Sequence, residues 1–87
     1  MILAHVVGRI TSTIGHPGLA GRTLLVCAKL GADGEPARGY VIAVDSVGAG
    51  AGEMVIILDE GNGARQILGG TDLPVRSVVV GVVDDLG

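Results

Sequence analysis

The chain has 87 residues, of which 48% are hydrophobic and 17% charged, and its formal net charge is −3. An acidic chain whose sole aromatic residue is Tyr40 lacks the basic stripe and the stacking side chains that nucleic-acid binding requires. Its longest apolar runs, such as residues 54–58, fall far short of the roughly 18 residues of a membrane-spanning helix, which excludes that class.

The chain is more hydrophobic than its size explains, with a mean hydropathy of +0.62. A domain of this length buries only about 60% of its unfolded surface, so we expect the remaining apolar surface to be covered between subunits. An apolar strand begins directly at Met1 with no basic segment before it, and the single cysteine, Cys27, lies in apolar sequence. Both features favour a reduced, cytoplasmic setting.

The first half of the chain predicts three strands. Alternation over residues 2–13 predicts the first strand, with Gly8 marking a bend or bulge. A turn-rich stretch at 16–21 precedes a second strand at 23–30, and Asp33-Gly34 has the chemistry of a hairpin turn. A third strand is expected at 39–45. Strict alternation assigns one face of the first strand to Ile2, Ala4, Val6, Gly8 and Ile10.

The second half predicts two strands, at 54–59 and 77–84, with a short helix at 64–68 between them. No connection is long enough for the crossover helix of a parallel βαβ unit. Five short strands with glycine bends and one short helix therefore predict a mostly β fold, a small closed barrel similar to an OB-fold. The whole chain, residues 1–87, is expected to form a single domain.

A glycine-rich loop links the third and fourth strands, and consists of Gly48, Ala49, Gly50, Ala51 and Gly52. A dinucleotide-binding turn needs a different glycine spacing and a following helix, and a P-loop needs a lysine where this chain has Glu53. The loop therefore predicts no nucleotide cofactor. A segment of backbone and methyl groups alone suits crowding around an axis or contact with another backbone.

The remaining polar residues show no catalytic or metal-binding pattern. His5 and His16 lack companion ligands at suitable spacing, and the apolar flanks of Cys27 do not activate a thiol. Asp45 and Glu53 bracket the glycine loop, where we expect Asp45 to accept local N–H groups and Glu53 to pair with a basic residue of its own or a neighbouring subunit. Two further residues are candidates for subunit contacts, Arg65 and Arg76. No enzyme, cofactor or metal site is predicted.

Several segments, taken in order, resemble the EutN/CcmL family, whose pentamers close the vertices of bacterial microcompartment shells. The central match is the loop Asp45-Ser46-Val47-Gly48-Ala49-Gly50-Ala51-Gly52-Glu53. Four other parts of the family pattern are matched in order. They are the opening strand at residues 1–8, the entry to the second strand at 21–26, the turn before the short helix at 60–65 and the closing strand at 74–84. The chain departs from the family pattern at Asn62-Gly63, where serines are common, and at Arg76, where an Asp is common.

The resemblance implies a cytoplasmic homopentamer of barrels around a narrow axial opening. We expect loop 48–52 to lie near the five-fold axis, because it has no side chain larger than a methyl group and small residues let five copies converge. It implies a structural role, in which pentamers fill the vertices that hexameric and pseudohexameric shell proteins leave open when they tile flat sheets. The alternative is a ring-forming barrel similar to co-chaperonins. Those proteins depend on a long mobile loop with an apolar docking motif, which the longest candidate here, residues 32–38, lacks.

Overall fold

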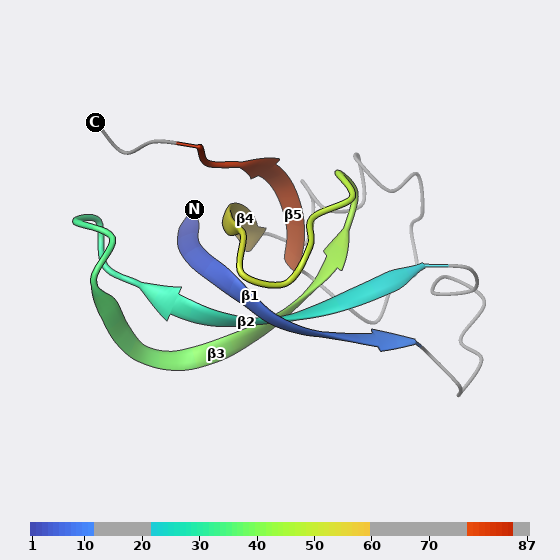
Figure 1. Cartoon of the computed structure of the whole chain (residues 1–87), viewed down its shortest axis with the longest axis horizontal. Coiled ribbons are helices and arrows are strands. Elements are labelled where there is room, and N and C mark those ends of the chain that lie inside the picture. The colour runs from blue at the N-terminus through green and yellow to red at the C-terminus, as the bar shows by residue number, and fades with distance from the viewer. Residues whose placement is uncertain (12–21, 60–76, 85–87) are drawn as a thin grey trace.

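The computed structural model describes residues 1–11, 22–59 and 77–84, which form a closed five-stranded barrel. Its strands are β1 (Ile2–Thr11), β2 (Thr23–Leu30), β3 (Pro36–Asp45), β4 (Met54–Asp59) and β5 (Ser77–Val82). The order around the barrel is β1-β2-β3-β5-β4, and every neighbouring pair is antiparallel except β3 and β5 (Figure 1). The predicted mostly β closed barrel is confirmed, whereas the predicted helix at 64–68 lies outside the described residues.

The bulge predicted at Gly8 is present in β1 and changes which face its later residues occupy. Pairing with β2 shifts between Val6, opposite Cys27, and Gly8, opposite Val26. One extra residue in a strand exchanges the two faces beyond it. Ile10, which strict alternation assigns to the buried face of Val6, therefore lies opposite Leu24 and is 39% exposed. That assignment was wrong because the bulge resets the alternation.

The main core fills the inside of the barrel with side chains from every strand and from the glycine loop. The inward residues of β1, β2 and β4 alternate regularly, as the pleat of a strand requires. Its fully buried members are Ala4, Val6, Leu25, Cys27, Ala43, Ala49, Val55, Ile57 and Val79. A second cluster joins Val44 and Val78 with Leu24, Leu58 and Val80, which alternate with the inward set and so lie on the outer side of the sheet.

Two strands differ from their predicted bounds within the described residues, and the predicted end of the first strand, at residue 13, lies outside them. β3 begins at Pro36, ahead of the predicted start at Gly39, because this part of β3 pairs only with β2 and an edge tolerates proline and glycine. β5 ends at Val82 instead of Asp84. Its pairing nevertheless continues one residue further, since the N–H of Val83 donates to the carbonyl of Met54 at 2.8 Å.

Candidate functional site: the glycine loop and the exposed apolar surface

Asp45, the last residue of β3, holds the start of the glycine loop. Its Oδ1 accepts the backbone N–H groups of Val47 at 3.0 Å, Gly48 at 2.9 Å and Ala49 at 3.3 Å. This is the local capping pattern for which aspartate is favoured at turns. The carboxylate therefore fixes the path of the backbone as it leaves the strand.

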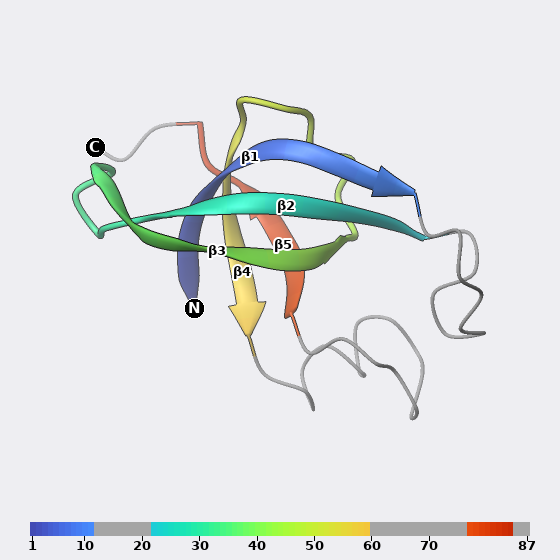
Figure 2. The same cartoon turned by 90° about the horizontal axis from the view of Figure 1, so that it is seen from below.

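Glu53 and the backbone of β1 hold the end of the loop. Oε1 of Glu53 accepts the N–H of Gly50 at 2.5 Å, and the N–H of Glu53 donates to the carbonyl of Gly50 at 3.1 Å. The carbonyl of Val6 accepts the N–H of Gly52 at 2.8 Å, and the N–H of Val6 donates to the carbonyl of Glu53 at 2.9 Å. The loop is thus tied to the strand beside it, and in Figure 2 it crosses above β1.

The small residues of the loop differ in their local surroundings. Gly48 and Gly52 adopt positive φ angles of 79° and 87°, which side chains rarely tolerate. A Cβ on Gly50 would lie 3.3 Å from Oε1 of Glu53. Ala49 is fully buried and belongs to the main core, whereas Ala51 is exposed. Sequence reasoning missed the burial of Ala49, because one alanine between glycines carries no periodic signal.

The other candidate residues do not gather into a site. His5 is half-buried on β1; His16, Arg65 and Arg76 lie outside the described residues. Cys27 is fully buried, and its burial, followed by the negative charge of Asp45, raises the pKa of the thiol above the ordinary 9.0. A neutral buried thiol is a poor nucleophile.

The described residues show no cluster of potential metal ligands. Within residues 1–11, 22–59 and 77–84, no group of three or more His, Cys, Asp or Glu side chains is placed to hold a metal ion. The same residues contain no helix long and apolar enough to cross a membrane. The prominent features of the molecule are therefore its shaped loop and its apolar surface.

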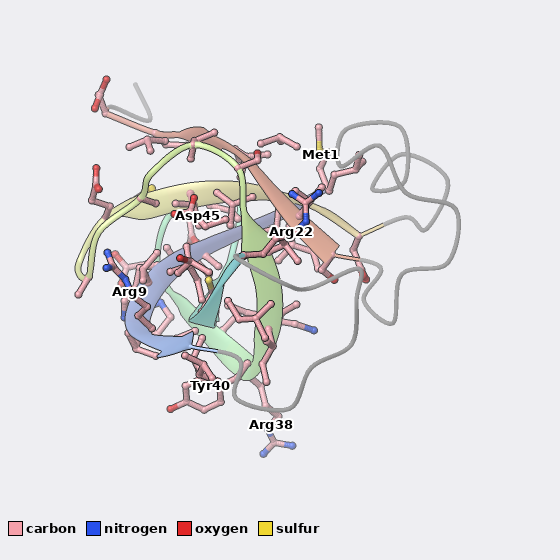
Figure 3. All side chains as sticks on the ribbon, turned by 90° about the vertical axis from the view of Figure 1, so that its right-hand side faces the viewer. Met1, Arg9, Arg22, Arg38, Tyr40 and Asp45 are labelled. Carbon is pink, nitrogen blue, oxygen red and sulfur yellow. The ribbon has the colours of Figure 1, made fainter. Side chains whose placement is uncertain are left out.

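Large hydrophobic side chains remain exposed on the single chain. Tyr40 is 69% exposed and Ile42 50% exposed, both on β3, and Val7 at the β1 bulge is 45% exposed. Figure 3 shows Tyr40 and Arg38 at the periphery, pointing away from the barrel. Further exposed residues of this kind are Met1, Ile10, Val47 and Val82. Contiguous exposed apolar surface usually marks contact with another protein.

A mostly apolar groove of about 540 Å³ lies where the β2–β3 hairpin meets the start of β1. Among the described residues, the hairpin and the barrel supply equal numbers of lining residues, and Lys29 is the only charged side chain. The lining residues are Met1, Ile2, Leu3, Lys29, Leu30, Ala32, Ala37 and Ile56. The groove lacks the several convergent polar groups that orient a small-molecule ligand.

Comparison with known proteins places the chain in one family. Residues 1–84 match the family model described as "Ethanolamine utilisation protein EutN/carboxysome". The chain is 44% identical to the microcompartment shell vertex protein PduN of Salmonella typhimurium, over 99% of this chain and 98% of PduN. It is 43% identical to the carboxysome shell vertex protein CcmL of Thermosynechococcus vestitus, over 97% of this chain and 84% of CcmL.

Solved structures agree with the sequence matches. The pentameric microcompartment shell protein GrpN of Rhodospirillum rubrum superposes with a TM-score of 0.83 at 39% identity, covering 98% of this chain and 95% of GrpN. CcmL of Gloeobacter violaceus gives a TM-score of 0.85 at 34% identity, covering 97% of this chain and 86% of that one. With its glycine loop, its barrel order and these full-length matches, the chain belongs to the EutN/CcmL family.

Proposed function

We propose that this protein is a structural shell protein that forms homopentamers and closes the five-fold vertices of a bacterial microcompartment. The observation that carries the proposal is the near full-length match, in sequence and in fold, to relatives named as shell vertex proteins. The fold is shared over 98% of the chain with a solved pentameric shell protein.

The exposed apolar surface supports assembly into a ring. A monomer with Tyr40, Ile42 and Val7 in water would be poorly soluble, whereas a cyclic assembly covers such residues between copies. The co-chaperonin-like alternative receives no such support, because the matched relatives are named as vertex proteins.

A role without catalysis fits the chemistry of the described residues. The carboxylates that bracket the loop, Asp45 and Glu53, accept backbone N–H groups of the loop itself. The buried thiol of Cys27 is held neutral. The relatives carry names of shell components, and we extend that non-enzymatic role to this chain.

The glycine loop is placed near the five-fold axis in this proposal. Its hydrogen bonds to Val6 and its capping by Asp45 make it a preformed element, so it needs no ordering when copies converge. Ala51 is the exposed methyl that the loop offers to its surroundings. Contacts of Glu53, Arg65 or Arg76 with neighbouring subunits belong to the same proposal.

Native mass measurement of the purified protein tests the ring. A pentamer is expected, a heptamer would favour the co-chaperonin-like alternative, and a stable monomer at micromolar concentration would refute the proposal. Placement of the loop is tested with Gly50→Leu and Ala51→Leu. We expect each substitution to impair assembly or to narrow the axial opening while the barrel still folds. If both variants form a pentamer with an unchanged opening, the loop does not lie at the axis.

Shell closure is tested by co-expression with hexameric shell proteins, the partners that we infer from the vertex role. Electron microscopy is expected to show closed polyhedral shells when this protein is present and open sheets or tubes when it is omitted. Closed shells in its absence would contradict a vertex role, even if the protein proved pentameric.

A further inference from the structure

The start of β1 and the end of β2 diverge, and the apolar groove lies between them. Among the described residues, residues 2–3 pair only with β4, and the pairing of β1 with β2 begins at Ala4, opposite Lys29. Leu30, the last residue of β2, pairs with Pro36 of β3. Figure 2 shows the first part of β1 running away from the end of β2. The two strand ends therefore form the opposite walls of the groove.

Lys29 lies where these two walls meet. Alternation along β2 places it on the same side as the fully buried Cys27, and its partner Ala4 is fully buried too. On the other side of β2, the strand β3 bulges, so that residues 37–39 face this one residue. A Cβ on Gly39 would lie 3.8 Å from Cδ of Lys29. The stem of the lysine is therefore packed and half-buried, in contrast to a lysine on an open surface.

The ammonium group of Lys29 has no counter-charge within the described part of the chain. No carboxylate there forms an ion pair with it. The two carboxylates of the adjoining turn, Asp33 and Glu35, do not line the groove, and Oδ1 of Asp33 accepts the N–H of Glu35 at 3.0 Å. A half-buried cation beside apolar walls attracts an anion more strongly than a cation in open water does, because the local dielectric constant is lower.

The apolar walls and the single cation together define a class of ligand. The volume of about 540 Å³ is typical of small-molecule sites, which span roughly 300–1,000 Å³. The groove has too few polar groups to orient a polar metabolite, whereas an alkyl chain needs only apolar contact along its length. Charge complementarity at Lys29 then selects an anionic head group.

We propose that the groove binds a medium-chain aliphatic monocarboxylate, with the carboxylate at Lys29 and the alkyl chain between the diverging ends of β1 and β2. Such a ligand supplies the missing counter-charge and covers apolar surface at the same time. This site is separate from the glycine loop and adds a binding function to the shell role proposed above.

Titration calorimetry of the assembled protein with hexanoate and octanoate, below the concentrations at which micelles form, tests the apolar walls. Each buried methylene should tighten binding by about 4-fold, so octanoate should bind on the order of 10-fold more tightly than hexanoate. Equal affinities for the two acids, or no binding of octanoate, would overturn the proposal.

Two variants at Lys29 test the head group. Lys29→Met keeps an unbranched stem without the charge, and we expect it to weaken octanoate binding by about 10-fold or more. Binding of octan-1-ol, which carries no charge, should change little in the same variant. Lys29→Arg keeps the positive charge and should retain most of the affinity. An unchanged affinity of Lys29→Met for octanoate would exclude Lys29 as the partner of the carboxylate.

Ala37→Leu tests the position of the ligand. Ala37 lines the groove and is exposed, so a larger side chain there narrows the groove without entering the core. We expect binding of octanoate and of octan-1-ol to fall by about 10-fold or more. Val7→Leu enlarges an exposed residue outside the groove by one methylene and serves as the control. Circular dichroism and native mass measurement check folding and assembly, and wild-type binding by a folded Ala37→Leu protein would place the ligand elsewhere.

The same measurements distinguish a ligand from a competing occupant. If the assembled protein does not bind octanoate but subunits separated by dilution do, a neighbouring copy covers the groove and the proposal fails. The oligomeric state is measured independently, so failure of octanoate binding leaves the pentamer standing, and failure of the vertex role leaves the binding result intact.

Discussion

The carboxylate of Asp45 accepts the N–H of Gly48 at 2.9 Å, which joins the end of β3 to the first glycine of the loop. The same oxygen accepts the N–H groups of Val47 and Ala49. One side chain therefore satisfies three successive backbone donors that would otherwise need water. This capping, more than the composition of the loop, determines how the chain leaves the barrel.

Asp45→Ala is expected to destabilise the protein by about 1–2 kcal/mol, because the three N–H groups lose their acceptor. Asp45→Asn retains an acceptor oxygen and should lose less. Urea unfolding at a fixed protein concentration measures both variants, since assembly contributes to apparent stability. Equal stability of wild type and Asp45→Ala would show that water replaces the carboxylate without cost.

The three loop glycines are expected to differ in their tolerance of alanine. Gly48→Ala and Gly52→Ala should each cost about 1 kcal/mol or more, because both positions have positive φ. Gly50→Ala should cost less, since its new Cβ meets only the flexible carboxylate of Glu53 at 3.3 Å. Thermal unfolding of the three variants side by side gives the ranking, and a larger loss at Gly50 than at Gly48 would contradict it.

The two loop alanines should respond in opposite ways to enlargement. Ala49→Leu forces extra carbon atoms into a filled core and is expected to destabilise the barrel by about 1–3 kcal/mol. Ala51→Leu adds them to an exposed position and should leave folding of the barrel intact. Circular dichroism and urea unfolding compare the pair, and equal losses in the two variants would contradict the burial of Ala49.

The buried thiol of Cys27 is expected to give the protein an alkaline sensitivity. Its pKa is raised above the ordinary 9.0, so the folded state binds the thiol proton more tightly than the unfolded state does. The resulting stabilisation is complete below the unfolded pKa and is lost as the pH rises through the folded pKa.

The stability difference between wild type and Cys27→Ala should therefore shrink as the pH rises from neutral into the alkaline range. Urea midpoints of both proteins across this range measure it, and other titrating groups cancel because the two proteins share them. A difference that stays constant with pH would show that the thiol does not titrate differently in the two states.

Much of this fold could be predicted from the sequence because its signals are local. The bounds of β2 and β4 agree with the apolar runs at 23–30 and 54–59. Gly8 inside an alternating strand indicated the bulge, and Asp33-Gly34 indicated the hairpin turn. In each case a residue type is tied to one backbone geometry.

The rest depends on contacts that only the closed barrel creates. The face occupied by Ile10 follows from where the bulge resets the register. The early start of β3 at Pro36 depends on an open edge, which sequence periodicity does not record. The burial of Ala49 arises because the loop returns to hydrogen-bond with Val6, a residue far away in the chain.

The parallel joint between β3 and β5 has a dynamic consequence. It contains two residue pairs among the described residues, Val44 with Val78 and Asp45 with Val79, whereas the β1–β2 ladder contains seven. The hydroxyl of Ser46 reinforces it by donating to the carbonyl of Val79, and the buried isopropyl groups of Val44 and Val78 pack across it. Native-state fluctuations that open the cylinder should therefore begin here, and amides beside this short joint should exchange their hydrogens earlier than those in the middle of β1 and β2.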